Sequence, residues 1–348
     1  MSSGQDTAAL TASILVPVLD EASRLERTAI AAIGQDVAGP IEVLFIDGGS
    51  VDGSRAILDR LAADDERVRV IDNPERVVPA ALNRGLAVAR GAYIARMDAH
   101  TIYPSDYVAR GIERLERGDV EWVTGPVYPD APAGFARCVA AALRSPLGQG
   151  GSAKWAGTNA NVPANGEVEL DTGVFAGVWR RATLERLEGW DPEFHVNEDA
   201  EMAARVLSDG GRIVCLPAMA ARYSPRETPL GLWRQYWRFG AYRAKTSRRH
   251  PIALRPEHLA SAALVTTVAM AVAPRGPLRR PARAVTLLWA ATIGAVGARA
   301  ASSRSVREAG GIALALATMH LAWGAGFVWG CLRGGPPLRA VRCLLSRR

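Results

Sequence analysis

Short apolar strands alternate with helical stretches between residues 12 and 123, and this alternation limits the fold more than any other feature. The expected strands read SILVPV, IEVLFI, RVRVI, AYIARM and VEWV, with helical stretches such as 54–63 and 79–89 between them. Strand and helix in turn imply parallel βαβ units with right-handed crossovers. Parallel strands buried on both faces read as continuous apolar runs, as IEVLFI does. We therefore predict an α/β fold with a Rossmann-like, mostly parallel sheet.

Three groups of residues, each with at least one acid, stand out along the chain. They are Asp47 with Asp52, Asp98 with His100, and Glu198 with Asp199. Asp47 and Asp98 each come at the end of an apolar strand, and ligands of such sheets gather beyond the carboxyl ends of the strands. The three groups predict a site for a nucleotide, a metal ion and a general base. A dinucleotide-binding oxidoreductase is excluded, because the first strand leads into PVLDEAS and lacks GxGxxG.

A helix is expected to begin at Glu198. Asn197 can cap it, and Gly210 with Gly211 can end it before the strand RIVCL. The helix then presents Glu198 and Asp199 in its first turn, where the helix dipole favours an ionised carboxylate. The Gly, Pro, Ala and Asn-rich stretch 129–172 predicts loops and short helices that cover a cleft and recognise an acceptor.

Three long apolar stretches lie after residue 257, at 258–273, 284–301 and 311–332. A run of roughly 18 apolar residues is long enough to span a membrane, so the last two qualify and the first is marginal. If all three crossed, the Arg275 cluster and the basic tail would face outward, against the positive-inside tendency. We therefore predict two spans plus one short element, with the loop that contains Arg304 and Arg307 outside. Small residues in the last stretch suit close helix packing.

The N-terminus MSSGQDTAAL shows no signal peptide. We therefore expect a multi-pass protein of the inner (plasma) membrane whose first domain is cytoplasmic. The expected regions are a flexible N-terminus at 1–11, a catalytic domain at 12–228, an interfacial amphipathic helix and linker at 229–257, membrane segments at 258–332 and a basic tail at 333–348.

The net charge of +7 comes almost entirely from arginine, since Lys154 and Lys245 are the only lysines. The aromatic and basic stretch 233–249 has the composition of a nucleic-acid binder, but its place before the apolar stretches makes membrane lipid the simpler partner. We predict lipid contacts and no nucleic acid. The four cysteines show no CxxC spacing and predict neither a zinc site nor a disulfide framework.

Six motifs together resemble the family 2 inverting glycosyltransferases of the GT-A fold, and more closely the succinoglycan-type exopolysaccharide enzymes. In chain order they read PVLDE, DGGSVDGS, LNRG, MDAHTIYP, NEDAE and QYWRFG. The resemblance covers about residues 12–247. It implies a membrane enzyme that moves a sugar from a nucleotide-diphosphate donor, expected to be a UDP-sugar, to a hydroxyl of a polyprenyl-diphosphate-linked acceptor. It leaves open whether the base is uracil or guanine, which sugar is transferred, and the oligomeric state.

The resemblance also assigns roles to single residues. Those expected to bind the donor are Pro17, Glu21, Asp47, Asp52, Asn83, Arg84 and Asp98. For Asp47 and its neighbours the alternative is an ordinary turn, because Asp, Gly and Ser favour turns for local reasons. For Asn83 and Arg84 the alternative is a solvated helix face.

Asp98 and His100 match the metal position of the family, where a second Asp is more common than His. Residues i and i+2 of an extended turn point to the same side, so both side chains can approach one cation. A nitrogen ligand suits Mn²⁺ better than Mg²⁺, although availability can favour Mg²⁺. The alternative for His100 is a polar surface residue.

Asp199 matches the general base that takes the proton of the acceptor hydroxyl, and Glu198 is expected to be structural or to face the acceptor. The alternative is that both are ordinary first-turn acids. Gln235 and Arg238 match a Q-x-x-R motif that contacts the diphosphate or acceptor in processive relatives. Phe239 replaces the Trp that usually follows, and Arg238 can equally be a cation at the membrane surface.

Two other functions remain open on the sequence. A polyprenyl-phosphate sugar synthase transfers sugar to the lipid phosphate and has no hydroxyl to deprotonate. A catalytically inactive membrane scaffold would keep the fold without the chemistry, although scaffolding requires none of the acidic groups.

Overall fold

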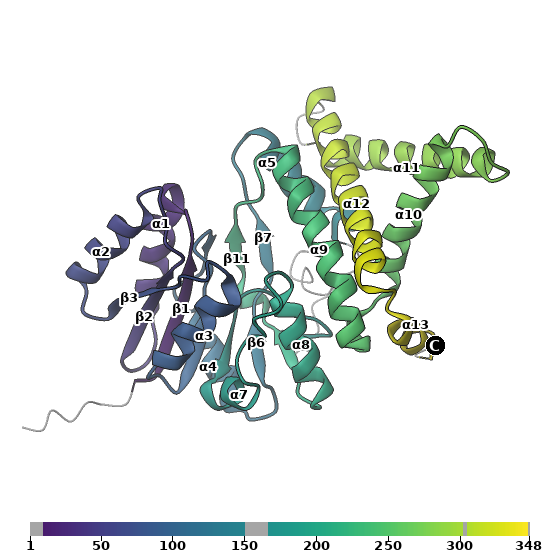
Figure 1. Cartoon of the computed structure of the whole chain (residues 1–348). Helices are drawn as coiled ribbons and strands as arrows, with labels where there is room; N and C mark the ends of the chain where they lie inside the picture. Colours follow the sequence, from purple (N-terminus) through teal and green to yellow (C-terminus); the bar gives the residue numbers. More distant parts are fainter. Residues whose placement is uncertain (1–9, 150–165, 302–304, 347–348) are drawn as a thin grey trace, which may run out of the picture. The chain divides into compact units, whose positions relative to one another are not determined.

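The computed structural model describes residues 10–149, 166–301 and 305–346. The chain divides into two compact units (Figure 1). We call Met1–Tyr128 with Ala153–Tyr223 the strand unit, and Pro129–Ser152 with Ser224–Arg348 the helical unit. The expectation that 1–11 is flexible falls largely outside the described residues, as does much of the predicted cleft cover.

The strand unit contains an eight-stranded sheet in the order β3-β2-β1-β4-β9-β6-β10-β8. The strands are β1 (Ala12–Val18), β2 (Ile41–Asp47), β3 (Val68–Asp72), β4 (Tyr93–Arg96), β6 (Trp122–Thr124), β8 (Val168–Leu170), β9 (Gly177–Arg180) and β10 (Ile213–Cys215). Strands β3, β2, β1 and β4 are mutually parallel, and β10 is parallel to β6. Strand β9 runs antiparallel to both β4 and β6, and β8 runs antiparallel to β10. The sheet is therefore mixed but mostly parallel, as predicted.

A second sheet has three short strands in the order β5-β11-β7. They are β5 (Thr101–Ile102), β7 (Val127–Pro129) and β11 (Ala221–Tyr223). The strand unit also contains six helices and one 3₁₀ turn among its described residues: α1 (Ala22–Ile33), α2 (Ser54–Asp64), α3 (Val78–Val88), α4 (Tyr107–Glu116), α7 (Arg181–Arg186), α8 (Glu198–Ser208) and η2 (Pro217–Met219).

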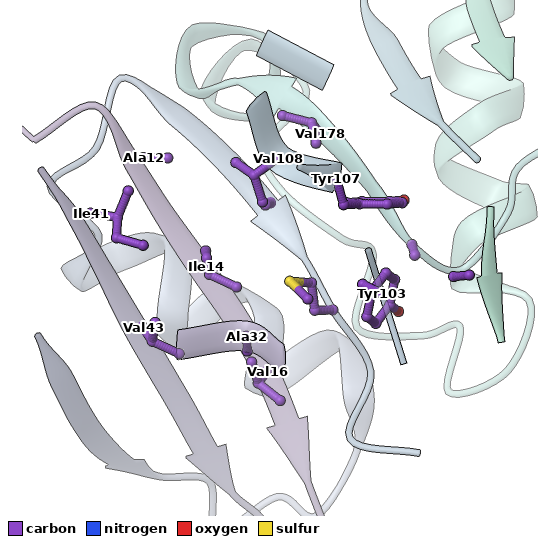
Figure 2. Packing of buried hydrophobic residues seen from close by; sticks show 14 of the residues in the cluster. Ala12, Ile14, Val16, Ala32, Ile41, Val43, Tyr103, Tyr107, Val108 and Val178 are labelled. Carbon is purple, nitrogen blue, oxygen red and sulfur yellow. The ribbon is translucent and has the colours of Figure 1, made fainter. Parts of the chain in front are cut away.

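Helices cover both faces of the large sheet, which explains why β1 and β2 are buried along nearly their whole length. Successive side chains of a strand point to opposite faces. In β1, Ile14 and Val16 join one buried cluster with residues of α1 and α4, whereas Leu15 joins a second cluster with residues of α3, α7 and α8. Figure 2 shows the first cluster, with Ile14 and Val16 near Val43 of β2 and Ala32 of α1.

Aromatic packing on this face supports the loop after β4. Tyr103 and Tyr107 meet edge to face, with ring centroids 4.9 Å apart, and both are buried (Figure 2). The hydroxyl of Tyr103 accepts a hydrogen bond from the backbone N–H of Asp98 at 2.9 Å. Core packing therefore fixes the backbone that carries Asp98.

Helix α8 begins and ends where the sequence predicts. The prediction that the Asn197 side chain caps it is wrong: Asn197 is the N-cap residue, but its backbone is left-handed (φ 62°) and its side chain makes no capping hydrogen bond. A left-handed residue at this position does not direct its side chain to the first-turn N–H groups as an extended N-cap residue does. At the other end, Gly210 has φ 77°, and Gly211 N–H donates to Val206 C=O at 2.9 Å, as in a glycine C-cap.

The helical unit is built from α5 (Gly134–Arg144), α6 (Pro146–Gln149), α9 (Pro229–Arg249), η3 (Pro251–Ala253), α10 (Pro256–Val272), α11 (Arg279–Ala300), α12 (Val306–Gly334) and α13 (Leu338–Ser346). Among the described residues, α11 and α12 are the two helices that are long and apolar enough to cross a membrane. Helix α10 is apolar but shorter. By length and composition this is the pattern predicted from the three apolar stretches.

Candidate functional site

Asp47 and Asp98 lie at the same edge of the large sheet. Asp47 is the last residue of β2, and Asp98 follows β4 by two residues. Strands β2 and β4 flank β1, and all three are parallel. With about 4.8 Å between neighbouring strands, the ends of β2 and β4 are roughly 10 Å apart. The predicted nucleotide and metal positions therefore converge at the carboxyl edge of the sheet.

The loop after β2 is organised by its own acids. Asp47 is buried, and its Oδ1 accepts from the Ser50 N–H at 3.1 Å and from the Ser50 hydroxyl at 2.6 Å. Asp52 accepts from the Ser54 hydroxyl at 2.6 Å and from the Ala22 N–H at 2.9 Å. These hydrogen bonds, that of Ser54 first, lower the pKa of Asp52. The turn that the sequence suggests is therefore present, with Asp47 bonded within it and Asp52 bonded to the start of α2 and of α1.

A buried arginine joins the second and third acidic groups. Arg96, the last residue of β4, has 2% of its side chain exposed. Its Nε donates to Asp98 Oδ1 at 2.8 Å, and its Nη2 donates to Glu198 Oε1 at 3.0 Å. Its Nη1 is also buried and has no hydrogen-bond partner among the described residues. Arg96 thus connects the end of β4 to the first turn of α8.

The two first-turn acids of α8 have different surroundings. Glu198 is buried against Arg96, whereas Asp199 is half-buried, and its Oδ1 accepts from the Ala200 N–H at 2.8 Å. Burial raises the pKa of Glu198 to about 7; Arg96 opposes this rise, and the negative charge of Asp199 adds to it. Asp199 is therefore the more accessible of the two carboxylates, which fits the predicted division of roles.

His100 faces an acid from another loop. Its Nδ1 lies 3.5 Å from Oε1 of Glu21, the residue that precedes α1, and its ring centroid lies 6.2 Å from that of Phe175. Pro17 lies within β1, in register with Ile46 of β2. The structure thus brings His100 and Glu21 together, one predicted as a metal ligand and the other as a donor contact.

Asn83 and Arg84 make contacts within the strand unit. The Asn83 amide donates to the Trp190 C=O at 2.7 Å, and its carbonyl accepts from the Trp190 N–H at 2.8 Å. Arg84 pairs on the surface with Glu75 at 2.7 Å. Both side chains therefore have structural partners, and their predicted contacts with the donor remain predictions.

Gln235 and Arg238 lie on α9 of the helical unit, with Gln235 half-buried and Arg238 exposed. Their predicted position near the diphosphate is a relation between the two units and remains a prediction. Aromatic side chains of this helix pack within the helical unit: the ring centroids of Trp237 and of Trp329 in α12 are 6.3 Å apart.

Three arginines of this region are absent from the predicted site. One is Arg96, and a second is Arg55, whose Nη1 lies 3.7 Å from Asp47 Oδ2. The third is Arg76, whose Nη1 donates to the Gly49 C=O at 2.6 Å and whose Nη2 lies 3.8 Å from Asp20. The signal for Arg96 is a charge inside the apolar run AYIARM, because a charged side chain is seldom fully buried without a partner. No comparable pattern marks Arg76.

The described residues contain no group of three or more His, Cys, Asp or Glu side chains arranged to hold a metal ion. The predicted metal site therefore has two protein ligands, Asp98 and His100. One or two carboxylates with substrate phosphates are a common Mg²⁺ arrangement, so a small set of this kind is chemically sufficient.

Comparisons with known proteins agree with this geometry. The profile of glycosyl transferase family 2 matches residues 13–166, and that of glycosyl transferase family group 2 matches residues 93–333. The chain is 32% identical over 340 residues to the succinoglycan biosynthesis protein ExoA of Rhizobium meliloti (strain 1021), covering 93% of this chain and 96% of that protein. The chain belongs to the family 2 glycosyltransferases. It is thus an enzyme of the transferase class with the predicted GT-A fold, related to exopolysaccharide synthesis.

Other similarities are more local or more distant. The glycosyltransferase GlyG of Streptococcus pneumoniae serotype 4 is 29% identical over 117 residues, which are 33% of this chain and 38% of that protein. The solved structure of the mannosyltransferase PcManGT from Pyrobaculum calidifontis, in complex with GDP-Man and Mn²⁺, is 19% identical. It aligns with 98% of this chain and 89% of its own, with a TM-score of 0.48.

Proposed function

We propose that this glycosyltransferase moves a sugar, with inversion, from a nucleotide-diphosphate donor to a hydroxyl of a polyprenyl-linked acceptor at the cytoplasmic face of the membrane. The reaction would belong to exopolysaccharide or cell-envelope glycan synthesis, which is supported by the similarity to ExoA over 93% of the chain. The single observation that carries the chemistry is the Arg96 bridge, which holds the acid after β4 beside the acidic first turn of α8.

The donor is expected at the carboxyl edge of β1, β2 and β4. The Ser50 hydroxyl donates to Asp47 Oδ1 at 2.6 Å, whereas Oδ2 lies 3.4 Å from the Ser50 backbone N and 3.7 Å from Arg55 Nη1. A carboxylate oxygen has two lone pairs, so Oδ2 can still accept from a ring N–H of a base. A UDP-sugar is the preferred donor on the family resemblance. Glu21 and Asp52 lie in adjoining loops, because Asp52 accepts from the N–H of Ala22 at the start of α1, which Glu21 precedes. Pro17 lies near the end of the adjacent strand β1.

A divalent cation fits at Asp98. Both carboxylate oxygens contact Arg96, at 2.8 and 3.3 Å, but each oxygen has a second lone pair available for a ligand bond. Such an ion, Mn²⁺ or Mg²⁺, would supply Lewis-acid neutralisation of the leaving diphosphate. His100 can add its Nε2, because Glu21 faces its Nδ1. Arg96 orients the Asp98 carboxylate.

Asp199 is the proposed base. It lies in the first turn of α8 and is the less buried of the two acids that begin this helix. It takes the proton of the acceptor hydroxyl while that oxygen attacks the anomeric carbon opposite the diphosphate. Glu198 is committed to Arg96 and serves to position this turn.

The test is donor-dependent release of nucleoside diphosphate by membranes that contain lipid-linked acceptors, with a panel of nucleotide sugars. Wild type should consume one donor in a metal-dependent reaction, and Asp98→Asn and Asp199→Asn should each lose about 10²-fold or more in kcat. Glu66→Gln, an exposed change in a turn of the strand unit, is the matched control. A wild-type chain that consumes no donor, beside an active positive-control enzyme, would favour a scaffold.

One comparison favours a second candidate. The chain is 31% identical over 107 residues to the dolichol-phosphate mannosyltransferase of Saccharomyces cerevisiae, which are 30% of this chain and 40% of that protein. A polyprenyl-phosphate sugar synthase would need no base for a hydroxyl. In that case Asp199→Asn keeps substantial turnover while Asp98→Asn does not, so the same two variants separate the candidates.

A further inference from the structure

Helix α12 begins beside α5. Arg137 Nη2 lies 3.3 Å from Glu308 Oε1, and the Cys138 thiol lies 4.0 Å from the Glu308 C=O. One turn further on, a Cβ placed at Gly311 would lie 2.6 Å from Cys138 Sγ. Glu308 has 13% of its side chain exposed. The first turns of α12 are therefore packed against α5.

Helix α5 is tied by its chain connection to a strand of the second sheet. Gly134 begins α5, and β7 ends at Pro129, five residues earlier. Five extended residues reach at most about 17 Å, whereas the hydrocarbon core of a bilayer is about 30 Å thick. The start of α5 therefore lies on the same side of a membrane as β7, and the Glu308 end of α12 lies there with it.

The other end of α12 packs against α9. Arg248 Nη1 donates to the Gly330 C=O at 3.0 Å and to the Gly335 C=O at 2.8 Å. The two backbones approach closely: a Cβ at Gly326 would lie 2.0 Å from the Trp237 C=O, and one at Gly240 would lie 2.0 Å from the Trp323 C=O. Small residues permit this contact along the second half of α12.

Helix α9 carries exposed basic residues, which disfavour its insertion into a membrane beside a spanning helix. Among its basic residues, Arg234, Arg238 and Arg249 are exposed. Cations in the hydrocarbon core are costly and rare. Because α12 lies against α9, an α12 that crossed the bilayer would bring these arginines into it. Neighbouring elements also bury 50% of the apolar 18-residue stretch of α12, in contrast to 17% of the corresponding stretch of α11.

The two long apolar helices are also not a parallel pair. Figure 1 shows α11 running across the direction of α12, and the two touch where a Cβ at Gly297 would lie 2.5 Å from the Ala309 C=O. Membrane helices tilt by about 20° on average and up to about 40° from the bilayer normal. Two helices that run across one another are therefore not arranged as two spans that both lie near the bilayer normal.

We propose that α12 does not cross the membrane, and that both of its ends lie on the side of the strand unit, with the helical unit seated in a bilayer surface rich in anionic headgroups. This rests on the membrane attachment in the proposed function, but it replaces the two-span topology expected from the sequence. Exposed apolar side chains of α10 and α11, such as Val272, Leu287 and Leu288, face lipid. Arg275 and Arg280 beside them meet the headgroups.

The first test is a disulfide between α5 and α12 in native membranes. A Cβ at position 311 would lie 3.4 Å from the Cβ of Cys138, close to the separation found across a disulfide. Gly311→Cys, oxidised in membranes, should therefore form a bond with the native Cys138, detected by mass spectrometry of the linked peptides. Gly310→Cys, whose Cβ would meet nothing within 4 Å, is the control and should not. Absence of the 138–311 bond would overturn the packing.

The second test asks on which side the α11–α12 connection lies. Arg307, exposed in the first turn of α12, is changed to Cys and treated with a membrane-impermeant maleimide, before and after permeabilisation of the cells. Labelling only after permeabilisation is expected, as for Glu66→Cys in the strand unit. Labelling of intact cells at position 307, with position 66 protected, would establish a span and overturn the proposal.

A third measurement separates this inference from the proposed function. The purified full chain should float with vesicles of phosphatidylglycerol, and less so with phosphatidylcholine or at high salt. If the chain binds neither vesicle, the proposed attachment to a membrane surface is wrong. Catalysis can then still be tested by measuring sugar transfer to a soluble acceptor. A chain that floats but is labelled from outside retains the proposed function and loses only the topology.

Discussion

Arg96 and Glu198 form a buried ion pair across 102 residues of sequence, with 3.0 Å between Nη2 and Oε1. The same guanidinium holds Asp98, so two carboxylates share one cation at the meeting point of β4 and α8. Burial by itself lowers the pKa of Arg96, but the charges of Asp98 and Glu198 outweigh it and raise the pKa above its ordinary value. The pair fixes where the first turn of α8, and hence Asp199, stands relative to Asp98.

We expect Arg96→Met to destabilise the full chain by about 3–5 kcal/mol, because it leaves the buried Glu198 and the half-buried Asp98 without their cation. Glu198→Gln should cost less, since Arg96 keeps Asp98 as a partner. The double variant should be more stable than the sum of the single losses predicts, by about 0.5–3 kcal/mol. Denaturant unfolding followed by tryptophan fluorescence measures each value.

Arg114→Met is the matched control for Arg96. Arg114 is also buried and pairs with Glu167 at 2.6 Å and Asp119 at 2.6 Å, away from the acidic edge of the sheet. Both variants should lose stability. At a temperature where both remain folded, only Arg96→Met should lose turnover. Equal turnover in the two variants would reduce Arg96 to a purely structural residue.

Asn83 offers a choice between a structural and a donor-binding role. Its amide makes two hydrogen bonds to the backbone of the buried Trp190, so Asn83→Ala should cost about 1–3 kcal/mol of unfolding free energy by leaving those groups unpaired. The KM for the donor should stay unchanged in the folded fraction. Arg84→Ala, which removes only a surface pair with Glu75, should leave the stability nearly unchanged. A raised KM with unchanged stability in Asn83→Ala would restore the donor-binding role.

Glu42 should shape the stability of the fold at acid pH. It is 1% exposed; burial by itself raises its pKa, but hydrogen bonds from Ser13 and Arg90, with a contribution from Arg69, lower the pKa below 4.5 overall. The folded state therefore binds fewer protons than the unfolded state in this range. The contribution of Glu42 is full above pH 4.5 and is lost as the pH falls through the folded pKa.

The measurement for Glu42 is the free energy of unfolding against pH for wild type and Glu42→Gln. The gap between the two curves should narrow below pH 4.5, because protonation removes the charge that the variant lacks. Curves that stay parallel down to pH 3 would show that Glu42 stabilises the fold without its charge.

The sequence predicts the elements whose pattern is local. Strands β1, β2 and β4 are long or apolar enough to be read, and the rule that parallel strands present ligands at their carboxyl ends correctly brings Asp47 and Asp98 to one edge. Strand β9 is different. It has four residues, and it lies between β4 and β6 through long-range pairs such as Trp122 with Trp179, so no periodicity marks it.

The convergence of the second and third acidic groups depends on a tertiary contact. The spacing between Asp98 and Glu198 does not show that one guanidinium reaches both, and the charge inside AYIARM is the only local sign. The topology of the apolar helices is not predictable for a similar reason. Hydropathy describes the sequence of α12 alone. Its contacts with α5 and α9 determine which neighbouring side chains would have to enter the membrane if α12 crossed it.

His100 provides the last prediction, because it tests whether the imidazole or only its neighbour Asp98 acts on the cation. If His100 is a ligand, His100→Asp should shift metal preference from Mn²⁺ towards Mg²⁺, since an all-oxygen set suits the harder ion. His100→Ala should weaken metal-dependent donor binding with either ion. Donor affinity is measured by calorimetry with each metal and with chelator, which requires no turnover.

Glu21→Gln is the control, because it removes the charge 3.5 Å from Nδ1 and leaves the imidazole in place. Unchanged metal preference in His100→Asp, together with equal effects of Glu21→Gln and His100→Ala, would assign His100 to holding the loop against α1 and leave Asp98 as the metal residue.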